Sequence, residues 1–532
     1  MTAFDAQPHA LTLRGVFEKA LQKYADRTAV HVDGQSLTYA ELDARANAVA
    51  HALAERGVGP NDRVALMMSN CLEYVIADLA IIKAGAAKIP LNDMLTASEF
   101  EYMLSDSGAG AVICGAGFVE TLDGFRDSLP ALETVIGIRD DEGTELPDGF
   151  EAFDELGGER SSPPSVDLST DDVAGHFYTG GTTGKPKGVI HRQTGLTMNV
   201  YAHVTELGID GDETLLLMTP LPHSAGMFLW AALLTGATSV IHAGFEPDTA
   251  LSRIQSERVT WTFMVPTMIY RLLDHPELDA HETDSLDTLV YGAAPMTPAR
   301  LREGLDEFGA VFLQFYGQTE VPNLITSFGK REHELAATEG PEERLSSAGQ
   351  PCLMADVKIV DPESGESLPA GEEGEILATA PYAMDSYYER PEATDETVTD
   401  GWVHTGDIGR IDEDGYVYLL DRASNMIITG GMNVYSTEVE EALDEHEALT
   451  EVAVIGVPDD EWGEAVTAIC VPQADADVSE SDIKAFADDR LADYKKPKHV
   501  EFVDEIPKTP YGKMDKKALR DDYWADEDRE IS

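Results

Sequence analysis

The sequence predicts an α/β fold, in which a large N-terminal domain of helix-covered parallel and mixed sheets, with a small antiparallel hairpin or barrel subdomain, precedes a small α+β domain. Three observations predict it. The chain has 532 residues, of which 43% are hydrophobic, enough for more than one buried core. Strand-like runs alternate with amphipathic helical patterns, which is typical of parallel sheets covered by helices. The same alternation restarts in miniature over roughly the last 110 residues, a length that can fold by itself.

The first expected elements alternate between strand and helix along the chain. Short apolar or β-branched runs bounded by turn residues predict the strands, and apolar residues at helical spacing predict the helices. The expected strands are 29–32, 64–67 and 260–265, and the expected helices are 39–56, 72–83 and 266–273.

Segment 215–244 is the best membrane candidate, because it contains no Asp, Glu, Lys or Arg. Pro220, Pro222, His223 and Gly226 interrupt it, so it is too broken to cross a bilayer as one helix. It predicts a strand, a loop and a buried helix, and we expect no membrane span.

Two later regions depart from the alternation. Segment 140–170 is rich in Asp, Glu, Gly, Ser and Pro and predicts a surface loop. From 382 to 420 the turns come closer together, one of them at 412–415, which predicts antiparallel hairpins. The small domain follows, so the expected domains are 1–421 and 422–532. Within it we expect strands at 426–428, 452–455, 466–471 and 499–503, and helices at 436–446 and 482–491.

The charge of the chain is strongly one-sided: 98 Asp and Glu against 38 Lys and Arg give a formal net charge of −60. Binding nucleic acid needs a basic face, so nucleic acid is excluded as the main partner. The carboxylates are either an ordinary solvated surface or an adaptation to high salt, where a Debye length of about 3 Å at 1 M screens their repulsion. Because the excess is spread along the whole chain, we favour the second, halophile-like interpretation.

The cysteines and the N-terminus indicate the compartment. Cys71, Cys114, Cys352 and Cys470 are far apart and form no Cys-x-x-Cys pair, so buried free thiols are expected. Residues 1–10 have no basic region and do not resemble a secretory signal. We therefore expect a cytoplasmic protein, and no pattern indicates an oligomeric state.

One short region reverses the overall charge. Between 495 and 517 there are seven lysines and only four acidic residues. The cluster is either a set of solubilising charges or a contact for a polyanionic ligand such as a nucleotide or coenzyme, and we favour the second interpretation. Its members are Lys495, Lys496, Lys498, Lys508, Lys513, Lys516 and Lys517.

The strongest motif is the stretch YTGGTTGKPKGV at 178–189. Glycines let the backbone approach an anion, while threonine hydroxyls and lysines add donors and positive charge. The stretch is not a Walker A loop, because Thr179 stands where that motif has its first glycine and Pro186 follows Lys185. The pattern predicts phosphate binding by Thr179, Gly180, Gly181, Thr182, Thr183, Gly184 and Lys187.

This stretch resembles the phosphate loop of the AMP-forming, adenylate-forming superfamily, which includes acyl-CoA synthetases, peptide-synthetase adenylation domains and luciferases. Six further motifs resemble those of the family and follow in its order, so the resemblance runs from 12 to 520. They are the acyl-site motif at 220–223, the adenine-side loop at 291–295, the signature Y-G-x-T-E at 316–320, the ribose motif at 402–407, the hinge and glycine turn at 421–434, and the lysine motif at 507–513.

The resemblance implies ATP, Mg²⁺ and CoA as co-substrates of a small-molecule carboxylic acid. The acid attacks the α-phosphate of ATP, and a thiol then displaces AMP. Because the first step places negative charge on phosphates, it needs cations and donors. Lys513 is expected to bridge the carboxylate and the α-phosphate, Glu320 to bind Mg²⁺, and Thr319 to hold the α-phosphate. Ordinary surface or capping roles are the alternatives.

The resemblance also places the nucleotide. Tyr316 is expected to stack on adenine, with core packing as the alternative. Asp407 is expected to accept hydrogen bonds from the ribose with Arg422 nearby, unless the two form a structural ion pair. The remaining adenine-side residues are Gly292, Ala293, Ala294 and Gly317.

The acid is expected beside His223, which the family pattern makes a catalytic residue of the acyl site and which could otherwise be a satisfied core histidine. Met227, Gln318 and Val321 complete the expected acyl pocket. No placed cation or Asn is evident that would require an amino or hydroxyl substituent. For thiol delivery, the resemblance implies that the small C-terminal domain is mobile. Ser424 is the expected hinge, and Gly430 and Gly431 are expected to border the CoA tunnel.

The favoured function is an AMP-forming acyl-CoA synthetase for a medium- or long-chain fatty acid. The alternatives are a benzoate- or cinnamate-type aryl-CoA ligase, an adenylation enzyme for a separate carrier protein, a luciferase-type oxygenase, and a non-catalytic nucleotide or acyl binder. The intact Lys513 and Glu320 argue against the binder.

Overall fold

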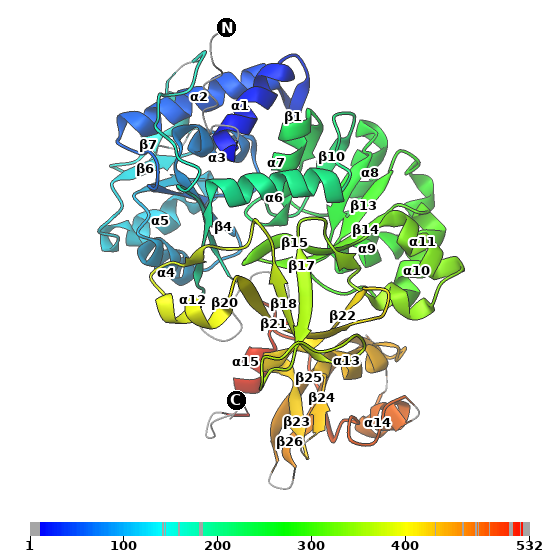
Figure 1. The fold of residues 1–532 in the computed structure, drawn as a ribbon. Coiled ribbons are helices and arrows are strands. Elements are labelled where there is room, and N and C mark those ends of the chain that lie inside the picture. Colours follow the sequence, from blue (N-terminus) through cyan, green and yellow to red (C-terminus); the bar gives the residue numbers. More distant parts are fainter. Residues whose placement is uncertain are drawn as a thin grey trace. The chain divides into compact units, whose positions relative to one another are not determined.

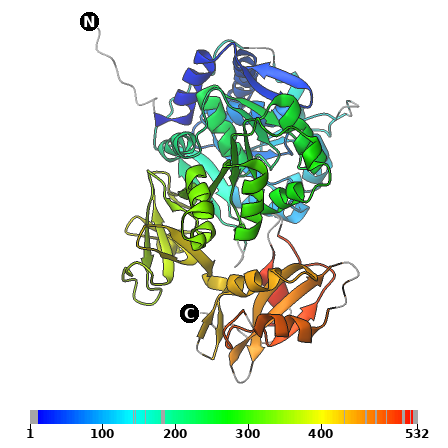
Figure 2. The same cartoon turned by 90° about the vertical axis from the view of Figure 1, so that its right-hand side faces the viewer.

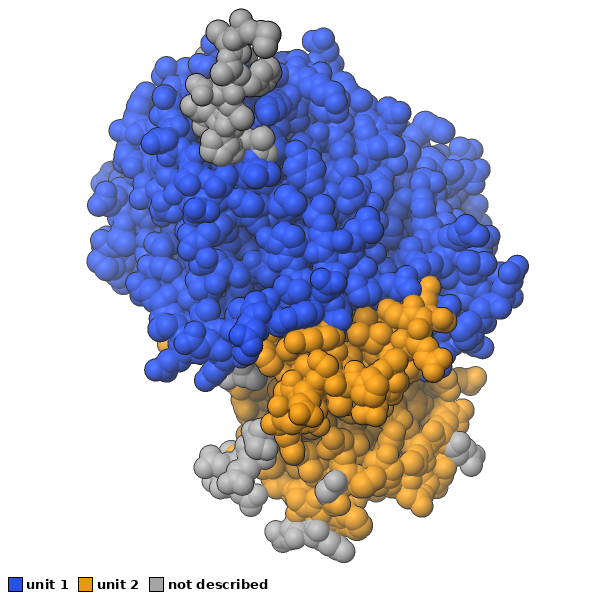
Figure 3. All heavy atoms as spheres, in the orientation of Figure 1, with its two compact units in different colours: residues 1–179, 186–357, 378–403 blue, residues 180–185, 358–377, 404–532 orange. Residues whose placement is uncertain are grey.

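The chain folds into two compact units, which Figure 3 colours separately. Unit 1 comprises residues 1–179, 186–357 and 378–403, and unit 2 comprises residues 180–185, 358–377 and 404–532. The expected domain boundary after residue 421 falls inside unit 2 and remains a prediction. The computed structural model describes residues 11–140, 143, 145–157, 160–179, 185–430, 432–459, 462–473, 476, 478–488, 490–509, 514–521 and 523–524.

The first sheet of unit 1 is mixed, with parallel strands in the middle and antiparallel strands at both edges. In Figure 2 the helices drawn in green stand in front of its green strands. Its spatial order is β16 (Gln350–Pro351), β15 (Val321–Phe328), β14 (Phe312–Gln318), β13 (Thr288–Tyr291), β12 (Trp261–Met264), β10 (Thr214–Leu217), β11 (Thr238–Ile241), β1 (Thr28–Val32) and β2 (Gln35–Thr38).

The second sheet of unit 1 is also mixed. Strands from β4 to β7 pair in parallel, and β9 pairs antiparallel with both of its neighbours. Its spatial order is β19 (Ser386–Tyr387), β9 (Gly188–Arg192), β8 (Val173–Tyr178), β4 (Ala87–Leu91), β3 (Arg63–Met67), β5 (Ala111–Cys114), β6 (Thr134–Gly137) and β7 (Glu151–Ala152).

The helices of unit 1 surround these sheets (Figure 1). One apolar core draws residues from both sheets and from α2, α3, α6 and α7. Helices α3 and α7 are buried on nearly all sides, which their uniformly apolar sequences explain. The helices are α1 (Leu13–Lys23), α2 (Tyr39–Glu55), α3 (Leu72–Ala84), α4 (Ala97–Ser107), α5 (Val119–Phe125), α6 (Gln193–Glu206), α7 (Ser224–Thr235), α8 (Pro247–Glu257), α9 (Pro266–Leu273), α10 (Pro298–Phe308), α11 (Lys330–Thr338) and α12 (Pro391–Thr397).

A sheet that belongs mostly to unit 2 contains the expected hairpin. Strands β21 and β22 pair antiparallel, and Asp412 caps the turn between them by accepting from the backbone N–H groups of Asp414 and Tyr416. The strands of this sheet are β17 (Asp356–Val360), β18 (Gly374–Thr379), β21 (Trp402–Ile411) and β20 (Val398–Thr399), with β22 (Val417–Arg422) paired to β21.

The other sheet of unit 2 has its own apolar core. Strands β25 and β26 form a long antiparallel pair, and β27 joins β26 in parallel. Its strands are β24 (Met432–Val434), β23 (Ile427–Thr429), β26 (Gly463–Pro472), β25 (Leu449–Asp459) and β27 (His499–Phe502). The helices of this part are α13 (Ser436–Asp444), α14 (Glu480–Asp488) and α15 (Lys516–Asp521).

The structure confirms the expected α/β class with an antiparallel subdomain and a smaller α+β part. Segment 215–244 is the expected strand, loop and buried helix, followed by β11. The expected surface loop at 140–170 contains short β7 and a 3₁₀ turn at Phe153–Glu155. Within the described residues, no helix is both long and apolar enough to cross a membrane. The four cysteines are free, and three of them are buried while Cys71 is half-buried.

Candidate active site

The signature motif turns the chain between two strands of unit 1. Gln318 at the end of β14 pairs with Val321 at the start of β15, so Thr319 and Glu320 occupy the two turn positions. The Glu320 side chain is held there although the residue is only 8% exposed, because the Tyr387 hydroxyl donates to its Oε1 at 2.5 Å. The Met384 backbone N–H also donates to the Glu320 carbonyl at 2.7 Å. A buried carboxylate is therefore fixed next to the turn, and its hard oxygens suit Mg²⁺, which proteins bind through one or two carboxylates together with substrate phosphates.

Thr319 is oriented through its backbone. The Nε2 atom of buried His191 lies 2.9 Å from the Thr319 carbonyl oxygen. Because a carbonyl only accepts, Nε2 carries the proton. Burial lowers the pKa of His191 to about 4, so the ring is neutral at physiological pH and its tautomer is set by this bond. The carbonyl is tied to β9, and the Thr319 hydroxyl remains the group available for a phosphate.

The flanks of the phosphate loop meet the same cluster. The Thr179 backbone N–H donates to the Lys187 carbonyl at 3.0 Å, which closes the base of the loop. The Lys187 ammonium lies 4.2 Å from the centre of the Tyr387 ring, a cation–π contact. The predicted residues Thr179, Lys187, Thr319 and Glu320 therefore lie in one neighbourhood. Gly180, Gly181, Thr182, Thr183 and Gly184 lie outside the described residues.

The adenine-side loop follows β13. Ala293 has φ of 68°, a left-handed conformation that is strained for a residue with a Cβ. Tyr316 is half-buried at the edge of the apolar core. Gly317 packs against the backbone of Asn323, and a Cβ on it would lie 2.3 Å from the Asn323 carbonyl carbon. Only glycine fits at this position of the signature. Gly292 and Ala294 belong to the same turn.

The expected acyl-site residues gather around the start of α7 and the start of β15. His223 precedes α7 and is half-buried. Met227, one turn into α7, is 9% exposed, and Val321 is fully buried in the same core. Gln318 is half-buried at the end of β14. Their roles in binding an acid remain predictions.

The ribose motif lies in unit 2. Asp407 on β21 and Arg422 on β22 are cross-strand partners, with Arg422 Nε 2.7 Å from Asp407 Oδ1. The ion pair that the sequence left as an alternative is therefore present. The Thr405 hydroxyl also accepts from the Asp407 backbone N–H at 3.1 Å. Both groups are held in one orientation, which is compatible with binding a ribose as well.

The expected hinge is held from within unit 2. Ser424 lies in a 3₁₀ turn at Ala423–Asn425. Arg520 on α15 donates to the Ser424 carbonyl and to Asn425 Oδ1, each at 3.1 Å. Gly430 follows β23 with φ of 59°, and a Cβ there would lie 2.7 Å from the Trp462 ring. Gly431 lies outside the described residues.

The lysine-rich segment pairs largely with carboxylates of its own unit. Lys495 contacts Glu438 at 2.6 Å, Lys496 contacts Asp493 at 2.8 Å, and Lys516 contacts Glu440 at 2.7 Å. Because these lysines are already paired with carboxylates, fewer members of the cluster are available to contact a polyanion. The predicted catalytic Lys513 lies outside the described residues.

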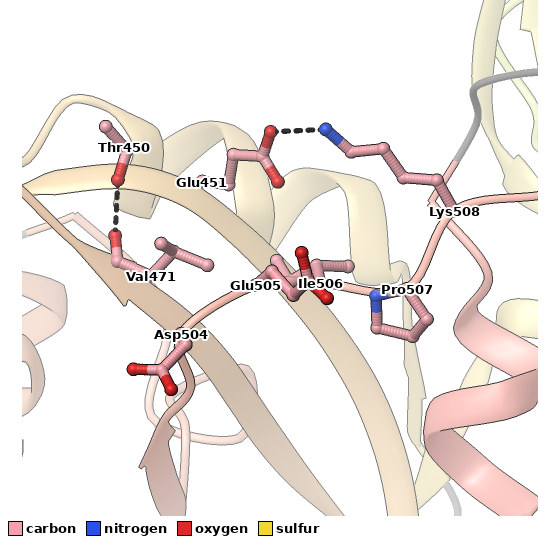
Figure 4. Close-up of a pocket in the computed structure, with 8 residues that line it drawn as sticks. All are labelled: Thr450, Glu451, Val471, Asp504, Glu505, Ile506, Pro507 and Lys508. Atoms are coloured by element: carbon pink, nitrogen blue, oxygen red, sulfur yellow. Dashed lines mark hydrogen bonds and ion pairs between the residues drawn. The ribbon is translucent and has the colours of Figure 1, made fainter.

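A hollow of about 480 Å³ lies beside the start of the lysine motif. Figure 4 shows Lys508 at its rim, paired with Glu451 at 2.6 Å. A bridge between Lys508 and Met514 brings together the two ends of the segment that contains Lys513. Because Asp504 and Glu505 also line the hollow, it is a poor site for ATP or CoA, and we do not assign it to a substrate.

Comparison with known proteins decides the family. A family model described as "AMP-binding enzyme" matches residues 17–388, and one described as "AMP-binding enzyme C-terminal domain" matches residues 438–513. The chain belongs to the AMP-binding enzyme family. The resemblance drawn from the motifs is confirmed.

Two curated relatives and one solved structure illustrate the range of this family. The chain is 35% identical over 524 residues to a medium/long-chain-fatty-acid–CoA ligase, FadD8, of Mycobacterium tuberculosis, covering 95% of this chain and 89% of the relative. It is 38% identical over 496 residues to a feruloyl-CoA synthase of an Amycolatopsis species, covering 93% and 95%. The structure of ATP-bound MatB from Rhodopseudomonas palustris superposes with a TM-score of 0.85 at 31% identity, covering 96% and 99%.

As a member of this family the chain is an AMP-forming acid–CoA ligase, with ATP, Mg²⁺ and CoA as co-substrates. Two residues of its site, Tyr387 and His191, are not predicted from the sequence. Tyr387 is 67 positions from Glu320 and His191 is 128 positions from Thr319. No local pattern marks either contact, although His191 lies on β9, the strand that leaves the phosphate loop directly after Lys187.

Proposed function

We propose that this AMP-forming ligase activates a hydrophobic carboxylic acid, either a medium- to long-chain fatty acid or an aryl acid. One observation carries the proposal. Glu320, whose carboxylate is buried, and Val321, whose apolar side chain is fully buried, are consecutive residues. The charged chemistry and the apolar lining therefore meet at a single point of the chain, and the acid would place its carboxylate on one side of that point and its apolar body on the other.

The predicted site residues then divide between adenylate formation and the later transfer to CoA. Glu320, oriented by Tyr387, would bind Mg²⁺ on the phosphates of ATP, and Thr319 would donate its hydroxyl to the α-phosphate. Lys187 lies beside them and adds positive charge where negative charge develops. Lys513 would bridge the acid and the α-phosphate. Ser424, Gly430 and Gly431 would serve the later transfer to CoA.

The class of acid is the finer part of the proposal. The sequence favours a fatty acid, and relatives of comparable similarity include both a fatty-acid–CoA ligase and a feruloyl-CoA synthase. A benzoate- or cinnamate-type acid is therefore an equal candidate. A separate carrier protein as acceptor is the remaining alternative, and we expect CoA to be preferred.

The test is a CoA-thioester assay across acetate, octanoate, palmitate, benzoate and a cinnamate-type acid. We expect acetate to be the poorest substrate and one apolar class to dominate. Pyrophosphate release without thioester would show adenylation for another acceptor. Failure of every acid to release pyrophosphate would refute the proposed function.

A further inference from the structure

A chain of hydrogen bonds crosses the expected acyl site in unit 1. Ser224, the first residue of α7, donates from its hydroxyl to Asn323 Oδ1 at 2.9 Å. Asn323 Nδ2 lies 2.9 Å from His203 Nε2, and His203 Nδ1 lies 2.8 Å from the Asn199 carbonyl oxygen. Ser224 follows His223 of the acyl-site motif, and Asn323 lies three residues after Glu320. The three elements concerned are α6, α7 and β15 (Figure 1).

The direction of every bond in this relay can be assigned. A backbone carbonyl only accepts, so His203 carries its proton on Nδ1. His203 is fully buried, and burial lowers its pKa to about 4, so Nε2 is unprotonated and accepts from the amide of Asn323. The Asn323 side-chain oxygen then faces Ser224 and accepts a hydrogen bond from its hydroxyl. The orientation of the Asn323 amide is therefore set by the histidine.

The backbone around Asn323 is held in a costly conformation. Asn323 has φ of 62°, in the left-handed region that Asn tolerates better than other residues with a Cβ. Fully buried Asn199 donates from Nδ2 to the carbonyl of Pro322 at 2.8 Å, which fixes the residue immediately before it. One turn of α6 thus positions both the backbone and the side chain of Asn323. Such strain at a site is typical of a functional constraint.

The relay leaves two polar positions unused. One N–H of the Asn323 amide donates to His203, and the second N–H makes no hydrogen bond to a described residue. The Ser224 hydroxyl donates its proton to a hydrogen bond with Asn323, and its oxygen lone pairs accept none from the described residues. Within the described part of the chain neither of these has a partner. Both residues are half-buried, whereas His203 is fully buried, so Ser224 and Asn323 form the accessible end of the relay. The edge offers one donor and one acceptor side by side, which is the complement of a hydroxyl group.

We propose that Ser224 and Asn323 are specificity-determining residues, which select a hydrophobic acid that bears a hydroxyl group. The substrate hydroxyl donates to Ser224 Oγ and accepts from Asn323 Nδ2. This inference rests on the proposed function and names its substrate class more closely. It applies to a phenolic acid and to a hydroxylated alkyl acid alike, because both present the same donor and acceptor.

The energetics favour a large effect. An apolar pocket discriminates between acids that differ by one hydroxyl by no more than about 10²-fold, whereas a site built to bind that hydroxyl can reject the analogue lacking it by about 10⁴-fold. Because Ser224 and Asn323 are only half-buried, water can replace a missing hydroxyl in part. We therefore expect a preference of about 10- to 100-fold in kcat/KM.

The experiment compares matched pairs of acids on the full-length ligase with ATP, Mg²⁺ and CoA. The pairs are 4-hydroxycinnamate and cinnamate, 4-hydroxybenzoate and benzoate, and 10-hydroxydecanoate and decanoate. Each pair is measured with the wild type, with Ser224→Ala and with Asn323→Gly, which tolerates the left-handed backbone. Ser239→Ala is the matched control, because Ser239 is fully buried in β11 of the same sheet and its hydroxyl has no partner among the described residues.

At least one hydroxylated acid should exceed its partner about tenfold or more in the wild type and in Ser239→Ala. In Ser224→Ala and Asn323→Gly this ratio should fall to within about threefold. A purely structural role would lower both acids of a pair equally and leave the ratio unchanged, which would overturn the inference. Equal rates within every wild-type pair would also overturn it while leaving the ligase assignment intact. Absence of thioester from all six acids would count against the proposed function itself.

Discussion

Two charged regions of this ligase are built in opposite ways. In unit 1 the signature carboxylate Glu320 is held by the neutral hydroxyl of Tyr387, whose ring also lies under Lys187. In unit 2 four of the described lysines between 495 and 517 are held by carboxylates, as in the pairs Lys495–Glu438 and Lys508–Glu451. The first arrangement orients a charge without neutralising it, and the second neutralises the charge it orients.

The difference shows that positive charge counted along the sequence is not the same as positive charge available to a ligand. A lysine paired with a carboxylate presents little net field to an approaching phosphate. The anion-binding chemistry of the C-terminal segment therefore depends on Lys513 more than on the cluster around it. At the signature, by contrast, the charge on Glu320 stays available to a metal ion.

The largest expected effect comes from Lys513→Ala, which tests whether one lysine supplies the chemistry of its segment. Removing a cation aimed at the developing charge should lower adenylate formation by about 10²- to 10⁴-fold. Thioester formation from supplied acyl-adenylate should be spared, since that step no longer needs the α-phosphate to be activated. Pyrophosphate release and thioester formation are measured separately.

The matched control for this experiment is Lys517→Ala, which removes the same charge four residues away. If the cluster acts as a whole, both variants will lose adenylation to a similar extent. That outcome, or an equal loss in both half-reactions of Lys513→Ala, would contradict the assignment of a special role to Lys513.

Tyr387→Phe tests the other side of the comparison. The variant removes the hydroxyl that orients Glu320 but keeps the ring that lies under Lys187. Loss of a partner behind a metal-binding group typically costs about 10- to 100-fold in metal affinity or activity. We expect the Mg²⁺ concentration for half-maximal adenylation to rise by that factor. Tyr388→Phe removes the neighbouring hydroxyl as a control, and an equal shift in both variants would show that Glu320 is not oriented by Tyr387.

Asp421→Asn should have a smaller effect, confined to the stability of unit 2. Asp421 Oδ2 accepts from the backbone N–H and the hydroxyl of Ser436 at 2.5 and 2.6 Å, and Oδ1 accepts from the Arg422 N–H at 2.7 Å. In Asn the amide nitrogen would replace one of these accepting oxygens and would face an N–H or O–H donor. We therefore expect the free energy of local unfolding at the start of α13 to fall by about 1–2 kcal/mol. Hydrogen exchange of α13 peptides measures it. Glu413→Gln, on the exposed turn after β21, should leave exchange unchanged, and wild-type exchange in Asp421→Asn would argue against the cap.

Much of the fold could be predicted because periodic patterns are local. Helix α9 spans the expected residues 266–273, and α2 and α3 end within one residue of their expected bounds. Strand β25 is much longer than the expected 452–455, because its pairing with β26 continues through polar residues that no apolar run marks. Strand β24 was not expected, since Met432–Val434 is too short to show a period.

The candidate site could be predicted only where its motifs are contiguous. The signature turn and the flanks of the phosphate loop are short sequence motifs, and they lie together as expected. Asn323 was missed, although it interrupts an apolar strand, because its meaning depends on His203 and Ser224 at separations of 120 and 99 residues. Such contacts are set by packing between elements, and no local pattern encodes them.

Glu440 gives the smallest expected effect and carries the comparison into pH dependence. Burial raises its pKa to about 7, while Lys516 at 2.7 Å lowers it and Asp421 raises it slightly. Between these two pKa values the folded state holds a proton that the unfolded carboxyl, with its ordinary pKa near 4.5, has released. The stability from this group is therefore full below about pH 4.5 and falls as pH rises toward 7.

Hydrogen exchange of β25 at pH 5, 6 and 7 should show opening of this strand becoming easier as pH rises. Glu440→Gln should reduce that slope, because an amide and a protonated carboxyl are both uncharged. Glu441 and Asp444 lie on the same helix, α13, and their pKa values are also raised, so they account for the slope that remains. An unchanged slope would therefore mean that Lys516 holds Glu440 ionised. In that case Lys516 and Glu440 would form a neutral ion pair like the other lysine–carboxylate pairs of unit 2. Every such pair of unit 2 would then differ from Glu320, whose carboxylate is held by an uncharged hydroxyl.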